Sequence, residues 1–145
     1  MIIDSQALLS DAQAVTADAV STNTFDSGAA GNDISVGEPL VAVIQVDVAA
    51  DFTTTDETYE FQVIQSAAAN LSSPDVLCLR AILAADLTAG SIHHIPIPQG
   101  SKTKRYLGLN YNVGGTSPSV TVTAFFQPAS MLQKDKVYAD GITIS

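Results

Sequence analysis

Hydrophobic and polar residues alternate most clearly over residues 105–128. Leu107, Leu109 and Tyr111 fall on one face of an extended chain, and the residues between them are glycine or asparagine. Such alternation is typical of strands that bury one face. A second alternating run, SVTVTAFFQP, follows the turn sequence GGTSP. Because Gly-Gly supplies the positive φ angles of a tight reversal, the pattern predicts a β-hairpin with one face in a core.

Four further stretches have strand character. Residues 40–48 (LVAVIQVDV) are apolar on both faces in their first half, which predicts a strand covered on both sides. Residues 59–64 alternate and predict a half-buried strand. Residues 76–83 (VLCLRAIL) suit a helix or a strand, and we favour the strand because β elements flank it. The run IPIP at 95–98 predicts an edge or a rim, because proline cannot donate to a ladder.

The ends of the chain have weaker patterns. Over residues 1–25 we expect an extended arm with short strands at 11–15 and 20–25, and a weak helix is the alternative. Three glycines and a terminating proline predict a loop over residues 26–39. Residues 129–145 are mixed in character and read as a docking segment, with a last short strand at 141–144.

The chain therefore offers seven or eight short strands separated by Gly, Pro, Asn and Asp turns, without a β–helix–β rhythm. This pattern predicts an all-β protein, a single-domain jelly-roll-like β-sandwich with a short N-terminal arm. We divide it into residues 1–25, the arm and first short strands; residues 26–128, the sandwich body; and residues 129–145, the C-terminal docking segment. At 145 residues one domain with a substantial core is expected.

Charge excludes one class of partner. The chain has 15 acidic and 6 basic residues, a net charge of −9, and Arg80 is the only basic residue before Lys102. Such a protein repels a phosphate backbone, so we expect no nucleic-acid partner. No segment approaches the roughly 20 apolar residues of a membrane span, so we expect no membrane partner. The opening MIID has no basic region before an apolar stretch, which favours synthesis in a cytoplasm.

The residues that could carry chemistry do not form a recognisable site. Cys78 is the only cysteine and lies in an apolar run, where a buried structural role is the ordinary interpretation. His93 and His94 are adjacent, point to opposite faces of a strand and lack a ligand set. No GxSxG motif is present, the glycines of 26–39 lack a following Lys-Ser/Thr, and residues 51–58 lack the calcium-loop glycine. We expect no enzyme activity, no metal and no cofactor.

Several motifs resemble the small capsid cement (decoration) proteins of short-tailed bacteriophages. They are Ile3-Asp4, the run LSDAQAV at 9–15, Gly37-Glu38-Pro39 and the run RYLGLNY at 105–111. The likeness covers most of the chain and is weakest over residues 129–145. It implies a jelly-roll protein on the outer surface of the virion capsid, made in the host cytoplasm. Its partners would be the major capsid protein and itself, as a homodimer or homotrimer that bridges neighbouring capsomers.

Two groups of residues are candidates for partner binding. The first is the apolar start of the chain, which would reach across a neighbouring subunit as an arm: Ile2, Ile3, Leu8 and Leu9. The second is the basic turn, which would face an acidic patch on the shell or simply be solvated: Lys102, Lys104 and Arg105. The main alternative function is a carbohydrate-binding β-sandwich module on a virion surface, which requires a groove with exposed aromatic residues. A sandwich hydrolase would require a pair of carboxylates in a cleft.

Overall fold

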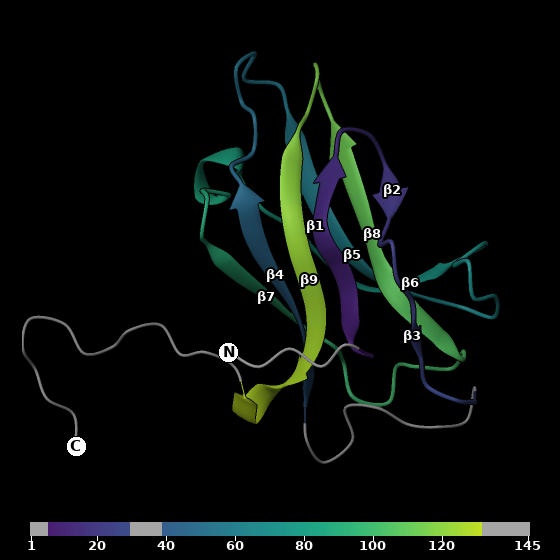
Figure 1. Cartoon of the computed structure of the whole chain (residues 1–145). Helices are drawn as coiled ribbons and strands as arrows, with labels where there is room; N and C mark the ends of the chain where they lie inside the picture. The colour runs from purple at the N-terminus through teal and green to yellow at the C-terminus, as the bar shows by residue number, and fades with distance from the viewer. Residues whose placement is uncertain (1–5, 30–38, 132–145) are drawn as a thin grey trace, which may run out of the picture.

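The computed structural model describes residues 6–29 and 39–131, and they form two antiparallel sheets packed face to face (Figure 1). The first sheet has the order β1 (Leu8–Val15), β9 (Val120–Pro128), β4 (Leu40–Val48), β7 (Ile92–Pro96). The second has the order β2 (Ala19–Val20), β8 (Tyr106–Gly114), β5 (Thr58–Ser66), β6 (Asp75–Ala81), and β3 (Phe25–Asp26) also pairs with β8. Two 3₁₀ turns, η1 (Ala84–Asp86) and η2 (Ala129–Met131), complete the described elements.

The strand order is that of a jelly roll. Strands β2 and β3 both pair with β8, so together they act as one interrupted strand, and each sheet then has four strands. From β3 onward, β5 and β6 are the only described strands that follow each other in the chain and also pair with each other. Every other connection between described strands in this range passes from one sheet to the other. The prediction of an all-β sandwich is confirmed.

The predicted hairpin over residues 105–128 is wrong. Strand β8 pairs with β5 in the second sheet, whereas β9 pairs with β1 and β4 in the first. The turn between them, with Gly115 at φ +91°, therefore crosses from sheet to sheet instead of joining two partners. Alternation of hydrophobic and polar residues indicates which face of a strand is buried. It does not indicate which other strand pairs with it.

The predicted burial of the same strands is confirmed. Leu107, Leu109 and Tyr111 of β8 are fully buried, and they belong to the same core cluster as the fully buried Val122 and Ala124 of β9. Each large side chain removed from water in this way contributes about 1.5–3 kcal/mol to folding. The sandwich thus draws its stability from the alternating faces that the pattern identified.

Two pairs of aromatic rings lie in the core or pack against it. Phe61 of β5 meets Tyr111 edge to face at 5.8 Å between ring centroids. Phe25 of β3 meets Phe126 of β9 in the same way at 5.6 Å, which ties the second sheet to the first. Edge-to-face pairs at these distances are favourable beyond the area they bury.

The other strand predictions have mixed outcomes. Strand β4 has the predicted bounds, and Val41 and Val43 on its outward face are as buried as Ala42 and Ile44 on its core face. Residues 75–81 form the strand β6 rather than a helix, and the IPIP run begins in β7, an edge strand. The expected strand at 20–25 is reduced to β2 and β3, and the expected strand at 141–144 lies outside the described residues.

Candidate functional site

The apolar start of the chain is only partly available to a partner. Leu9 is completely buried in the core as part of β1 and offers no surface to a partner in this fold. Its assignment to a partner-binding arm stays a prediction. Leu8 is half-buried and lies opposite Phe125 of β9 in the ladder. Ile2 and Ile3 lie outside the described residues, and their role stays a prediction.

The basic side chains of the turn at residues 102–105 already have partners within the chain. The side chain of Lys102 is 5% exposed, and its Nζ donates to the carbonyl oxygen of Ala29 at 3.0 Å. Its ammonium therefore binds within its own chain in this fold, and the contact of Lys102 with an acidic patch on a shell stays a prediction. Burial of a lysine stem with its ammonium on a carbonyl satisfies both parts of the side chain.

Lys104 and Arg105 reach the surface, but each has a carboxylate partner in its own chain. Lys104 Nζ lies 2.7 Å from Asp75 Oδ2. Arg105 binds Asp26 through two bonds, Nε to Oδ1 at 2.7 Å and Nη2 to Oδ2 at 2.9 Å, and its guanidinium lies 5.1 Å from the centroid of the Tyr106 ring. The hydrogen bond from Arg105, with one from the backbone N–H of Gly28, lowers the pKa of Asp26 to about 2. An acidic partner would have to compete with these pairs.

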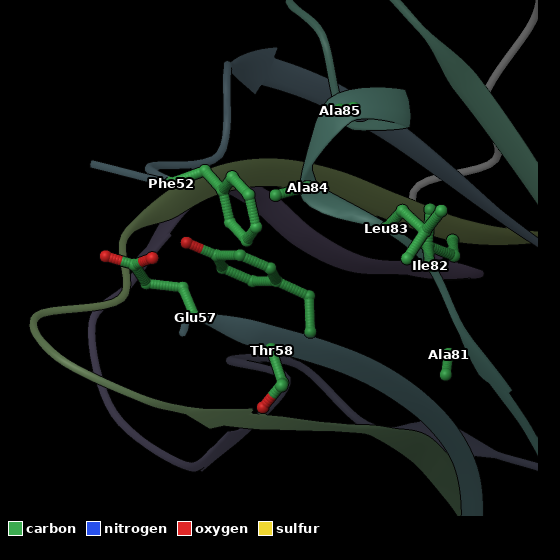
Figure 2. Close-up of a pocket in the computed structure, with 9 residues that line it drawn as sticks. Phe52, Glu57, Thr58, Ala81, Ile82, Leu83, Ala84 and Ala85 are labelled. Carbon is green, nitrogen blue, oxygen red and sulfur yellow. The ribbon is translucent and has the colours of Figure 1, made fainter. Parts of the chain in front are cut away.

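A pocket of about 280 Å³ lies where β5 begins and β6 ends (Figure 2). Phe52 and Glu57, from the connection between β4 and β5, lie on one side of it, and Ile82 and Leu83, after β6, lie on the other. Its lining is almost wholly apolar apart from Glu57, Thr58 and the hydroxyl of Tyr59. Phe52 is 46% exposed and Leu83 is 73% exposed, so the rim of the pocket presents large apolar side chains to solvent.

Glu57 is the unusual residue of this pocket. The residue is 4% exposed, and its Oε1 accepts hydrogen bonds from the backbone N–H and the hydroxyl of Thr54. Its Oε2 is buried and has no hydrogen-bond partner within residues 6–29 and 39–131. A buried carboxylate oxygen without a partner is costly, because burial removes the water that would solvate it.

Tyr59 shares the environment of Glu57. Its hydroxyl donates to the carbonyl oxygen of Asp51 and accepts from the backbone N–H of Ser119 at 3.2 Å. Burial raises the pKa of Tyr59, and the negative charges of Asp51 and Glu57 act in the same direction. The phenol therefore stays neutral and holds the connection that carries Glu57 in place.

Sequence reasoning missed this pocket. The acidic and hydroxyl residues of 51–58 predict a solvated polar loop, yet Glu57 is buried and Phe52 forms a wall of the pocket. The only available signal was Phe52, a lone aromatic residue in the polar stretch DFTTTDET. Its counterpart at residues 81–85 is distant in sequence, so no local pattern could bring the two together.

The residues considered for catalysis and metal binding are separated. His93 pairs with Ile44 and His94 with Val43 in the ladder, which places the two rings on opposite faces of the first sheet. Burial raises the pKa of the Cys78 thiol to about 11, so the reactive thiolate is scarce at neutral pH.

In the part of the chain that the structure describes, no three His, Cys, Asp or Glu side chains are placed to share a metal ion. Among the same residues, no helix has the length and apolar character to cross a membrane.

The fold places the protein in the class of all-β jelly rolls. Comparison with known families shows the family to which the chain belongs. The model of the family described as Bbp16 matches residues 9–126, which include every described strand except the ends of β1 and β9. The chain belongs to the Bbp16 family, which is phage-related.

Comparisons with individual proteins add little. No curated protein matches the sequence. Among solved structures, the chain is similar to a mutant form of xylanase 10C from Cellvibrio japonicus in complex with xylopentaose, with 17% sequence identity and a TM-score of 0.39. The match covers 85% of this chain and 27% of the xylanase chain.

Proposed function

We propose that the protein is a structural capsid cement (decoration) protein. It binds the outer surface of an icosahedral phage head, bridges neighbouring capsomers of the major capsid protein and stabilises the shell without catalysis. The observation that carries this proposal is membership of the phage-related Bbp16 family over residues 9–126. That region contains the runs LSDAQAV and RYLGLNY, which resemble motifs of cement proteins.

The surface supports a role in protein contact. Several large apolar side chains stay exposed, and they are not confined to one position in the sequence: Val48, Phe52, Val76, Leu79 and Leu83. Contiguous exposed apolar patches are typical of protein interaction sites, and two of these side chains, Phe52 and Leu83, line the same pocket. Among the described residues, Lys104 and Arg105 already have carboxylate partners, and the exposed Arg80 donates to the carbonyl oxygen of His94.

The mechanism is mass action. A ligand that binds only the assembled shell stabilises that state, and the effect grows with the concentration of the ligand relative to its dissociation constant. An ordinary protein interface buries roughly 1,600 Å² in total, and each copy that crosses a seam between capsomers adds one such contact to the shell. A homodimer or homotrimer offers the same contact surface more than once, which suits a bridge.

The carbohydrate-binding alternative receives less support from the side chains. Tyr59 and Tyr111 are buried, and Tyr106 is half-buried beneath Arg105. Phe52 is the aromatic residue among the described ones that exposes a substantial part of its ring. A sugar-binding groove needs aromatic faces open to solvent, so this surface suits a protein partner better.

Co-sedimentation with undecorated phage shells tests the proposal. We expect saturable binding at a fixed ratio to the major capsid protein, and light scattering should give the mass of a dimer or trimer. Bovine serum albumin at the same concentration serves as the control for trapping in the pellet. A monomer that stays in the supernatant at all concentrations would reject the cement role, and a glycan array would then test the alternative.

A further inference from the structure

We propose that strand β6 pairs with β6 of a second copy of this chain. The two strands run antiparallel about a two-fold axis, so that the second sheets of both copies form one continuous sheet. The expectation of a homodimer rests on the proposed function. The choice of β6 as the contact rests on the strand edges of this chain alone.

Strand β6 lies at the end of the second sheet, and one of its two sides lacks a strand partner. It pairs with β5 from Asp75 to Ala81, and no described strand pairs with its other side. The backbone N–H and C=O groups that point away from β5 therefore have no ladder partner within residues 6–29 and 39–131. A row of such groups is a template on which another strand can form hydrogen bonds.

The other edges of the two sheets carry features that discourage strand pairing. Strand β1 has two register shifts, and Ala12 within it has a φ of +47°. Strands β2 and β3 are only two residues long. In β7 the carbonyl oxygen of His94 accepts from Arg80 Nη1 at 3.1 Å, and that of Pro96 accepts from the Cys78 thiol at 3.4 Å. Bulges, short strands, prolines and covering side chains are the usual means of protecting a sheet edge.

Strand β6 lacks most of these features and exposes apolar side chains. Its seven residues, DVLCLRA, include no proline, glycine or lysine. It has a single bulge, where Leu77 has no partner in β5. Val76 is 47% exposed and Leu79 is 53% exposed. An unprotected edge strand with large exposed apolar side chains favours pairing with another strand.

Opposite charges lie at matching distances from the centre of β6. In the ladder with β5, Asp75 lies two positions from Cys78 on one side and Arg80 lies two positions from it on the other, because the bulge adds no position. Antiparallel pairing about a two-fold axis at Cys78 therefore places Asp75 of each copy opposite Arg80 of the other. Asp75 binds Lys104 through Oδ2, which leaves Oδ1 for the second copy. Opposite charges at facing positions stabilise a ladder, and the symmetry forms this pair twice.

The exposed apolar residues match in the same register. Val76 lies one position from Cys78 on one side, and Leu79 lies one position from it on the other. The two-fold pairing places Val76 of each copy opposite Leu79 of the other, which removes apolar surface of both from water. One register thus pairs the charged and the apolar residues together. This self-complementarity favours a second copy over a strand of another protein.

An edge charge tests the contact. Leu79→Lys places a lysine at an exposed position of β6, and we expect it to raise the dissociation constant of the dimer at least tenfold in sedimentation velocity. Val20→Lys, at a 37% exposed position on the opposite edge of the same sheet, is the matched control and should dimerise normally. Circular dichroism should show that both variants fold. An unmodified protein that is monomeric or trimeric, or a dimer that Leu79→Lys leaves intact, would overturn the proposal.

Hydrogen exchange locates the contact without a change at the edge of the unmodified protein. We expect the amides of residues 75–81 to exchange at least tenfold more slowly in the dimer than in monomeric Leu79→Lys. Residues 8–15 of β1, at an edge of the other sheet, should exchange equally in both. A dimer in which residues 75–81 gain no protection would overturn the assignment of β6.

Disulfide cross-linking tests the register. Facing residues of an antiparallel ladder have Cα atoms about 4.5–5.5 Å apart, which a disulfide can span. With Cys78→Ala in every chain, we expect a mixture of Val76→Cys and Leu79→Cys proteins to form a cross-linked dimer when copper–phenanthroline is the oxidant. Leu79→Cys protein alone should cross-link at least tenfold less, because its thiols lie two positions apart along the ladder. Equal cross-linking in the two samples would overturn the register.

Shell binding separates this contact from the proposed function. Residues 75–81 that gain protection only on shells would show that a strand of the shell protein occupies β6, which would overturn pairing between copies. A protein that dimerises through β6 and leaves shells unbound would support the contact and reject the cement role. If the protein does both, we expect Leu79→Lys to bind shells more weakly than Val20→Lys, because a dimer presents its shell contact twice.

Discussion

The hydroxyl groups of Ser10 and Tyr111 lie 2.6 Å apart and connect the two sheets through the interior. Ser10 belongs to β1 in the first sheet and Tyr111 to β8 in the second, and both residues are completely buried. Ser10 donates its own proton to Gln13 Oε1, so the Tyr111 hydroxyl is the donor to Ser10. Burial raises the pKa of Tyr111 well above that of free tyrosine, which keeps the phenol protonated.

Tyr111→Phe should lower the free energy of unfolding by about 1–2 kcal/mol, because Ser10 loses its donor in a site that water does not reach. Urea unfolding measures the change. Ser10→Ala completes a double-mutant cycle, in which we expect a coupling energy of at least 0.5 kcal/mol. Additive effects of the two substitutions would contradict the bond. Tyr106→Phe, at a half-exposed position of the same strand, should stay within about 0.5 kcal/mol of the unmodified protein.

Leu9→Ala should cost about 2–5 kcal/mol of stability, since it leaves a cavity in a completely buried site. Leu8→Ala, at the half-buried neighbouring position, is the matched control and should cost less. Thermal unfolding of the three proteins compares them. A Leu9→Ala protein that unfolds like the unmodified one would contradict the placement of Leu9 in the core and return it to a partner-binding arm.

Gly115→Ala should destabilise the protein more than Gly90→Ala. Both glycines have positive φ angles, +91° and +86°, so both substitutions strain the backbone by about 1 kcal/mol or more. Only at Gly115 would the new Cβ atom also meet the backbone of Asp56 and Glu57; at Gly90 nothing lies within 4 Å of it. Denaturant unfolding should therefore separate the two variants. Equal losses of unfolding free energy in the two variants would show that the turn between β8 and β9 does not pack closely against the backbone of Asp56 and Glu57.

The ion pair between Asp26 and Arg105 should make a pH-dependent contribution to stability. The pKa of Asp26 is about 2 in the folded protein, below its ordinary value of 3.8. A lowered folded-state pKa stabilises the protein above the unfolded-state pKa, and this stabilisation is lost as the pH falls through the folded-state pKa. We expect Asp26→Asn to be less stable than the unmodified protein at pH 6 and the difference to vanish towards pH 2.

Unfolding midpoints of the two proteins across that pH range measure the effect. Added salt should shrink the difference at pH 6, because the pair is exposed to solvent and therefore screened. Arg105→Gln should reproduce the same pH window. A difference between Asp26→Asn and the unmodified protein that is constant from pH 6 to pH 2 would contradict the role of charge.

The sequence predicted the faces of the strands better than their partners. Alternation at Leu107, Leu109 and Tyr111 arises from burial, which is a local property, and the structure confirms it. Pairing in a jelly roll is set by contacts between distant segments, so β8 lies beside β5 and β9 beside β1. The short loop between β8 and β9 looked like a hairpin turn because crossing between sheets and reversing within one use the same glycines.

The candidate site was harder to predict than the fold. Charge pattern alone placed Lys102 on the surface, but the fold turns its ammonium onto Ala29. Glu57 lies in a polar stretch that is typical of a solvated loop, and it is buried because the turn at Gly115 and the hydroxyl of Thr54 close over it. Contacts of this kind depend on the assembled sandwich, and no spacing in the sequence encodes them.

Electron cryomicroscopy of undecorated shells saturated with the protein tests whether it bridges capsomers. We expect jelly-roll density on the outer surface, with each oligomer in contact with at least two neighbouring capsomers. Shells whose outer surface carries no added density, or density that rests on a single capsomer without crossing a seam, would contradict it.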